Sequence, residues 1–323
     1  MGNLPNPETL FSDPLLRHIE LPIRAAYYPA GFRLELRTNS RDVAAAAEES
    51  WAHCVPVFDR PPLQMRVIVR PDGDLAPAPS YRSQEHLYAV VSDADNFAVA
   101  DLHALLGSIC VSARTAADHA WFRWFFLEAV AYTLLTQSYL VPAHAACVAR
   151  GGAGLLLCGP SGAGKSTLSF ACARAGWTFI ADDCAWLLPD VEDRIAVGMP
   201  RQVRLRPDAP RWFPELAGRE ERARPNGKLT LEFLLSEFPQ IRTASRCTVR
   251  QLVVLNRRRG PARLEVLPRG EAADSLLHDA PSYSDEVNRL RLRTFERLHA
   301  LPSYRLHYDA LEDAIRLLSE LQD

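Results

Sequence analysis

The stretch GLLLCGPSGAGKSTLSFACARAGWTFIADDCAWL, residues 154–187, decides the fold of this 323-residue chain. Its centre, GPSGAGKS at residues 159–166, matches the pattern G-x-x-x-x-G-K-[ST] of a phosphate-binding loop. The apolar run 154–158 predicts a strand before the loop, and residues 165–175 predict a helix after it that Gly176 ends. A strand, a glycine-rich loop and a helix in this order favour an α/β fold that binds a phosphorylated ligand.

The loop has the residue types that a bound triphosphate requires. Glycines let the backbone bend so that successive N–H groups point at phosphate oxygens, and the following helix directs its positive N-terminus at the same anion. Lys165 would reach the β and γ phosphates, and the Ser166 hydroxyl would ligate Mg²⁺. The alternative interpretation is a glycine-rich turn that only caps a helix. The residues expected to contact ATP are Gly159, Pro160, Ser161, Gly162, Ala163, Gly164, Lys165, Ser166 and Thr167.

Two adjacent aspartates, Asp182 and Asp183, follow the next predicted strand at residues 177–181. In an open parallel sheet ligands lie at the carboxyl ends of the strands, so both aspartates should lie near Lys165 and Ser166. One would hold Mg²⁺, and the other would orient or deprotonate an attacking hydroxyl. We assign Asp182 to the metal with Ser166, but the sequence does not decide between the two aspartates, and one of them as a turn or cap residue is the alternative.

His144 belongs to the segment VPAHAACVA, residues 141–149, which we expect to be a strand. The Gly151-Gly152 pair then predicts a hairpin into the strand of the phosphate loop. A lone histidine is usually structural. Beside an aspartate, however, His144 would tune the basicity of the carboxylate through its own protonation.

Taken together, the segment with AHA, the hairpin, GPSGAGKST, a helix and GWTFIADD resemble the catalytic domain of HPr kinase/phosphorylase. The order is closer still to the HprK-related kinase A group, whose members carry a different N-terminal region and occur with peptide-modification systems. The resemblance covers about residues 142–188 clearly and extends weakly to the C-terminus. It implies a kinase fold related to phosphoenolpyruvate carboxykinase. By this match the active-site positions are His144, Lys165, Ser166, Asp182 and Asp183.

Two departures from the HPr kinase pattern limit what the resemblance implies. Thr167 stands where HPr kinases carry a glutamate that helps to bind the metal, so metal coordination here should differ. The signature that HPr kinases use for phosphorolysis is absent from the C-terminal half. Both departures argue against HPr as the substrate and against a bifunctional enzyme. The family also implies a homo-oligomer, because HPr kinases are typically hexameric, but the different N-terminal region counts against it.

The composition places few other constraints on function. A formal net charge of −2 gives no general attraction to nucleic acid or to an anionic membrane. The seven cysteines are scattered without a CxxC pair, which argues against a disulfide scaffold or a zinc site and favours a reducing, cytoplasmic compartment. We find no signal peptide and no apolar run that could span a bilayer; the segment 120–141 is expected to be a buried helix.

Two domains are expected, with a boundary at 115/116. Alternating strands at 32–39 and 63–71 and a helix at 40–54 predict a small mixed α/β domain over residues 1–115. This region has no chemical motif, and substrate recognition is the role we expect of it. Residues 116–323 form the predicted phosphate-loop kinase domain.

Basic residues after the aspartate pair could stabilise charge on the transferring phosphate. The segments 199–207 and 222–233 hold several, and because the related kinases place basic residues after the aspartate pair, we favour Arg201 and Lys228. The alternative is a solvated basic loop.

We therefore expect an ATP- and Mg²⁺-dependent kinase that phosphorylates a hydroxyl, foremost serine, on a peptide or small protein. The catalytic residues would be His144, Lys165, Asp182 and Asp183. A regulatory module that senses ATP without transferring phosphate is one alternative, and a small-molecule kinase is the other. The two intact aspartates argue against the sensor, since a protein that only binds nucleotide needs no base.

Overall fold

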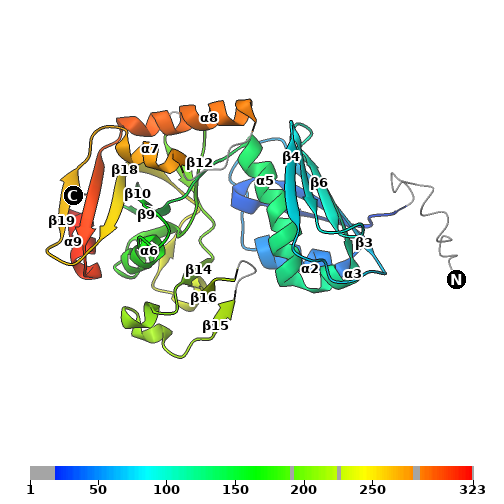
Figure 1. Ribbon diagram of the computed structural model, residues 1–323, viewed down its shortest axis with the longest axis horizontal. Coiled ribbons are helices and arrows are strands. Elements are labelled where there is room, and N and C mark those ends of the chain that lie inside the picture. The colour runs from blue at the N-terminus through cyan, green and yellow to red at the C-terminus, as the bar shows by residue number, and fades with distance from the viewer. Residues whose placement is uncertain (1–18, 190–192, 224–226, 279–283, 322–323) are drawn as a thin grey trace. The chain divides into compact units, whose positions relative to one another are not determined.

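The protein was analysed as a computed structural model that describes residues 19–189, 193–223, 227–278 and 284–321. The chain divides into two compact units, Met1–Leu134 and Leu135–Asp323. Each unit is a mixed α/β structure with its own large sheet, so the predicted α/β class agrees with the structure (Figure 1). No helix among the described residues is long and apolar enough to cross a bilayer.

The first unit contains a seven-stranded sheet with the order β1-β2-β3-β7-β6-β5-β4. The central strands β2, β3 and β7 run parallel, and the other neighbours are antiparallel. Alternate residues of the first part of β3 are buried, as the alternation of its sequence predicts. The strands are β1 (Ile23–Tyr27), β2 (Leu34–Thr38), β3 (Leu63–Arg70), β4 (Ser80–Gln84), β5 (Leu87–Val91), β6 (Phe97–Asp101) and β7 (Leu106–Ser112).

A helical run that the sequence placed in the second domain packs largely within the first unit. Trp51, a fully buried residue at the end of α2 (Arg41–Trp51), donates a hydrogen bond to the Tyr132 hydroxyl at 3.4 Å. The division at 134/135 therefore falls later in the chain than the expected 115/116. The run consists of α3 (Ala113–Ala117), α4 (His119–Phe122), the π-helix η2 (Arg123–Leu127) and α5 (Glu128–Ser138).

The second unit contains a ten-stranded sheet. Its main path is β17-β11-β9-β10-β18-β13-β12-β8, and β20 and β19 continue the sheet from β18. The strands are β8 (Val141–Ala143), β9 (Ala146–Arg150), β10 (Ala153–Cys158), β11 (Thr178–Ala181), β12 (Ala185–Leu187), β13 (Ile195–Val197), β17 (Arg242–Thr243), β18 (Arg246–Arg257), β19 (Arg263–Val266) and β20 (Ser303–Tyr308).

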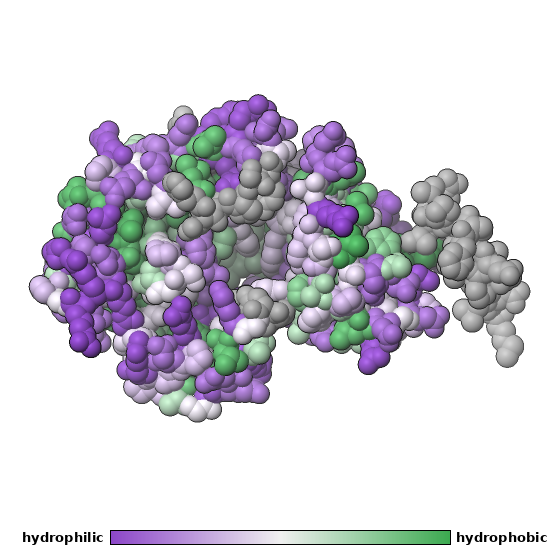
Figure 2. Space-filling model, in the orientation of Figure 1, coloured by the Kyte–Doolittle hydropathy of each residue, from purple (hydrophilic) through white to green (hydrophobic). Residues whose placement is uncertain are grey.

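The central strand β10 is paired on both edges, antiparallel to β9 and parallel to β18. Because side chains alternate along a strand, Leu155 and Leu157 enter one hydrophobic core and Leu156 and Cys158 enter another. Figure 1 shows α6 on one side of the sheet and α7 and α8 on the other. The helices are α6 (Lys165–Arg174), α7 (Glu271–His278), α8 (Asp285–Glu296), η6 (Arg297–Ala300) and α9 (Leu311–Glu320). Over α8 the visible face is mostly hydrophilic, as expected of a helix with one buried stripe (Figure 2).

A small three-stranded sheet, β14-β16-β15, packs against α6. The ring of Phe170 on α6 lies edge-on to the rings of Phe213, Phe233 and Phe238, at centroid distances of 4.9, 5.1 and 5.5 Å. This aromatic cluster holds the segment 202–213 beside the phosphate loop. The elements are β14 (Gln202–Leu205), η3 (Ala209–Arg211), η4 (Pro214–Leu216), β15 (Glu221–Ala223), β16 (Leu229–Leu234) and η5 (Leu235–Glu237).

Candidate active site

The phosphate loop joins β10 to α6, as the sequence predicts. Gly162 and Gly164 adopt φ values of +91° and +98°, a region that favours glycine. A Cβ on Gly164 would also lie 2.7 Å from the Tyr308 hydroxyl. Because Gly164 stands at the N-cap of α6 and has no capping side chain, the first-turn N–H groups of the helix are available to an anion.

The Lys165 side chain folds back onto the first residues of the phosphate loop. Its side chain is largely buried, with the residue 6% exposed, and its ammonium donates to the backbone oxygens of Gly159 at 2.6 Å and Pro160 at 3.4 Å. The same ammonium lies 3.0 Å from Nε2 of His144. A lysine ammonium has donors only, so His144 accepts through Nε2, and its ring proton then belongs on Nδ1.

His144 lies between strands rather than within one. The chain leaves β8, which pairs with β12, and enters β9, which pairs with β10 and β11, so residues 144–145 cross from one part of the sheet to another. A continuous strand was expected here, and the change of pairing partner is the physical reason for the break. The crossing places Nδ1 of His144 3.9 Å from Oδ1 of Asp183. His144 therefore contacts Lys165 with one ring nitrogen and faces Asp183 with the other.

The two aspartates have different surroundings. The Asp183 side chain is 64% exposed and lines the cleft. Asp182 is half-buried: its Oδ2 accepts the backbone N–H of Arg204 at 3.2 Å, and its backbone oxygen accepts the Ser166 hydroxyl at 3.3 Å. Burial raises the pKa of the Asp182 carboxyl from 3.8 to about 6; the Asp183 charge adds to this, and the Arg204 N–H opposes it. Local sequence could not separate the two, because the difference comes from β14, about twenty residues further along the chain.

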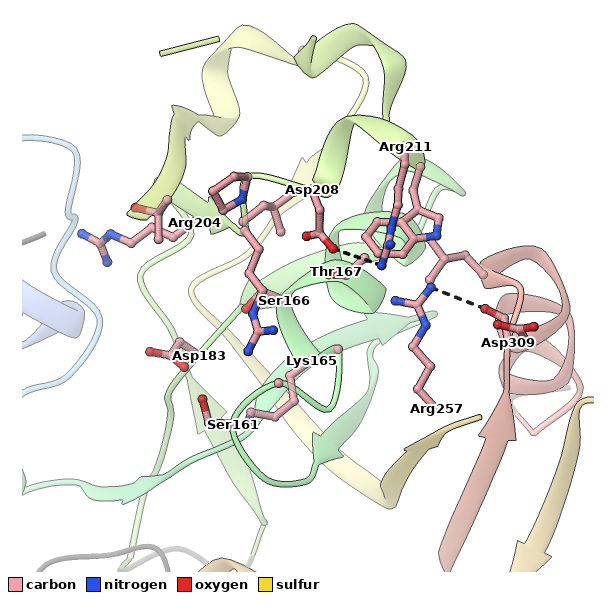
Figure 3. Close-up of a pocket in the computed structure, with 18 of the residues that line it drawn as sticks. Ser161, Lys165, Ser166, Thr167, Asp183, Arg204, Asp208, Arg211, Arg257 and Asp309 are labelled. Carbon is pink, nitrogen blue, oxygen red and sulfur yellow. Dashed lines mark hydrogen bonds and ion pairs between the residues drawn. The ribbon is translucent and has the colours of Figure 1, made fainter. Parts of the chain in front are cut away.

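A cleft of about 1250 Å³ opens at the phosphate loop, and every residue that lines it belongs to the second unit (Figure 3). The expected site residues that line it are His144, Ser161, Gly162, Gly164, Lys165, Ser166, Thr167, Asp183 and Lys228. The expected residues that do not line it are Gly159, Pro160, Ala163, Asp182 and Arg201.

Of the basic residues in segment 199–207, Arg204 and Arg206 line the cleft, and Arg201 does not. Nη2 of Arg206 lies 2.8 Å from the point where a Cβ on Gly162 would be, so its guanidinium rests on the phosphate loop itself. The sequence pattern of β14 indicates which of these arginines share a face. Val203 and Leu205 are the buried apolar residues of β14, which directs the residues between and after them to the other face.

The oxygen donors at the loop suit Mg²⁺. Proteins usually bind Mg²⁺ through one or two carboxylates together with substrate phosphates and water, and not through a cage of protein ligands. The described residues contain no group of three or more His, Cys, Asp or Glu that could enclose a metal. Ser166, whose hydroxyl donates to the backbone oxygen of Asp182, and Asp182 itself are the residues that would hold the ion.

Comparisons with known proteins add little to this geometry. No family model matches the sequence, and no curated protein matches it. Among solved structures, the chain is similar to the HPr(Ser) kinase/phosphatase from Coxiella burnetii, with 12% identity, coverage of 56% of this chain and 95% of that chain, and a TM-score of 0.29.

Proposed function

We propose that the chain is an ATP- and Mg²⁺-dependent kinase that transfers the γ-phosphoryl group to a hydroxyl. The observation that carries the proposal is the line of contacts from Lys165 through His144 to Asp183. On this path Lys165 would supply the cation for the phosphates and Asp183 the exposed carboxylate for the acceptor, which supports the proposal. A protein that only senses nucleotide has no need of the second group.

The roles follow from the contacts. The loop N–H groups and Lys165 hold the β and γ phosphates, and Arg206 adds positive charge over the loop. Asp183 accepts the proton of the attacking hydroxyl, because its carboxylate is the one that lines the cleft. His144 keeps its Nδ1 3.9 Å from Oδ1 of Asp183, so the imidazole ring lies beside the carboxylate. Bound Mg²⁺ would neutralise phosphate charge, with Ser166 and Asp182 as its protein ligands.

For the acceptor we propose a serine of a peptide or small protein. The exposure of Asp183 supports this choice, since a hydroxyl on a large substrate can reach a carboxylate that is 64% exposed. The cleft volume of about 1250 Å³ exceeds the range of roughly 300–1000 Å³ that is common for small-molecule sites, which leaves room for an acceptor beside a nucleotide.

A transfer assay tests the proposal. The protein would be incubated with γ-labelled ATP, Mg²⁺ and a panel of serine-containing peptides, in parallel with Lys165→Ala and Asp183→Asn. We expect label on a peptide with the wild-type protein and none with either variant. If wild type binds ATP but labels no peptide, the peptide acceptor is wrong, and a panel of small hydroxyl compounds distinguishes a metabolite kinase from a sensor. If Lys165→Ala retains full transfer, the assignment of the phosphate loop as the site that holds the transferred phosphate is wrong.

A further inference from the structure

The wall of the cleft beyond the phosphate loop carries a stack of two guanidinium groups and an indole ring. Cζ of Arg211 lies 3.6 Å from the centroid of the Trp212 ring, and Cζ of Arg257 lies 4.2 Å from it. Trp212 packs against the hydrophobic core below it, so the ring is fixed in place. We call these three residues the Arg–Trp–Arg stack; all three line the cleft.

The stack is anchored and continuous with the phosphate loop. Arg211 pairs with Asp208 at 3.0 Å, and Arg257 donates to the backbone oxygen of Asp309 at 3.5 Å (Figure 3). Cζ of Arg257 lies 5.8 Å from the ring of Tyr308, whose hydroxyl donates to the backbone oxygen of Ala163 in the loop at 3.5 Å. Tyr308 therefore contacts both the loop and the stack.

A nucleoside triphosphate bound at the phosphate loop would direct its nucleoside toward this stack. Lys165 marks the β and γ phosphates and contacts His144, which faces Asp183. In Figure 3, Asp183 lies on one side of Lys165 and Ser166, and Arg211 and Arg257 lie on the other. The terminal phosphate then faces Asp183, and the nucleoside extends along the opposite arm of the cleft.

We propose that the Arg–Trp–Arg stack is the nucleobase subsite, where the base stacks on the outer plane of a guanidinium group that the indole ring supports from behind. The inference rests on the proposed function to the extent that a nucleoside triphosphate occupies the phosphate loop. Nucleobases stack on aromatic rings and on arginine guanidinium planes, and such stacking tolerates different bases because every base has a π-face. The two arginines also place positive charge beside a polyanionic ligand.

The test compares ATP with inorganic tripolyphosphate, which has the phosphates and no base. Dissociation constants for ATP, GTP and tripolyphosphate would be measured by calorimetry on the full chain. The proteins are wild type, Arg257→Met and Arg211→Met, with Arg259→Met as the matched control. Arg259 is an exposed arginine two residues after Arg257, in the loop that follows β18, and it does not line the cleft. Methionine keeps an unbranched stem and removes the planar cation, and thermal melting of each variant checks that it is folded.

We expect Arg257→Met to weaken ATP and GTP by about 5- to 100-fold, while tripolyphosphate changes by less than about twofold. Arg211→Met should act in the same direction, and Arg259→Met should leave all three ligands unchanged. Equal losses for ATP and tripolyphosphate would reveal a general charge effect and overturn the base subsite, as would unchanged ATP binding in both stack variants. If wild-type protein binds tripolyphosphate as tightly as ATP, the base subsite is also wrong, but the phosphate loop remains the triphosphate site. Wild-type protein that binds neither ligand removes the proposed function as well.

Discussion

At the scale of single residues, His144 connects the two charged groups of the site. It accepts from Lys165 through Nε2 and faces Asp183 through Nδ1. Nothing in a lone histidine at this position distinguishes such a role from a structural one. The distinction comes from the crossing between β8 and β9, which only the folded sheet creates.

Substituting the aspartates one at a time should separate base from metal ligand. Asp183→Asn removes the carboxylate that lines the cleft, so we expect kcat to fall at least about 100-fold, the usual contribution of a general base, with little change in ATP affinity. Asp182→Asn should instead raise the Mg²⁺ concentration needed for half-maximal rate. Steady-state kinetics over a Mg²⁺ series measure both effects, and the reverse pattern would exchange the two roles.

The raised pKa of Asp182 also predicts how stability depends on pH. The folded protein binds the proton of this carboxyl more tightly than the unfolded chain does, since its pKa is about 6 when folded and near 3.8 when exposed. Its contribution is therefore fully present below pH 4 and is lost as the pH rises to 6, by up to about 3 kcal/mol. We expect Asp182→Asn to be more stable than wild type at pH 7. Its free energy of unfolding should also fall less than that of wild type between pH 4 and pH 6. Urea unfolding of metal-free protein from pH 4 to 7 measures the difference, and parallel curves for the two proteins would contradict it.

At the scale of elements, Gly154 in β10 lets two neighbouring strands approach each other. A Cβ at this position would lie 2.4 Å from Sγ of Cys247 in β18 and 2.9 Å from the backbone oxygen of Thr248. Cys147 of β9 and Cys247 approach to 3.5 Å between their sulfur atoms. The glycine is thus a packing requirement at the centre of the sheet.

Gly154→Ala should lower the free energy of unfolding by about 1–3 kcal/mol, the usual cost of overpacking a core. Adding Cys247→Ala removes the sulfur that the new methyl group would meet, so the double variant should recover part of the loss. Urea unfolding of both single variants and the double variant gives the coupling energy. Strictly additive effects would show that the clash with Cys247 is not the cause.

The elements around the phosphate loop could be predicted from sequence because each has a strong local signal. The apolar run at β10, the loop pattern and Gly176 after α6 place strand, loop and helix within a residue or so of the structure. The small sheet β14-β16-β15 was less predictable, because it is organised by contacts of Phe233 and Phe213 with Phe170, far apart in the chain. The alternation along β14 puts Arg204 and Arg206 on one face, but tertiary packing turns that face to the cleft, and the choice of Arg201 rested on the resemblance to related kinases.

At the scale of the whole molecule, the division between units was the least predictable feature. The alternating strands and helix of the first region end near residue 115 and suggested a boundary there, whereas the apolar helix after it packs on the first unit through contacts such as Trp51 with Tyr132. These residues lie 81 positions apart, so no local pattern records the contact. The helical character of the segment was predictable, but its partner was not.

Because all residues that line the cleft lie in the second unit, a fragment of residues 139–323 should bind ATP with a dissociation constant within about threefold of the full chain. Calorimetry on the fragment, with circular dichroism to check its fold, measures this. A folded fragment that has lost ATP binding would mean that the first unit contributes to nucleotide binding. Transfer to a peptide is a separate measurement, and its selective loss would assign acceptor recognition to the first unit.

The position of β10 has a consequence for the timing of motion in the second unit. The strand is hydrogen-bonded along both edges, so its amide hydrogens are expected to exchange with deuterium only when the whole unit opens. The phosphate loop begins where β10 ends, so its first residue is bonded directly to the strand whose amide hydrogens should exchange most slowly. A nucleotide that stabilises the loop should therefore slow deuterium uptake throughout the second unit, and not in the loop alone.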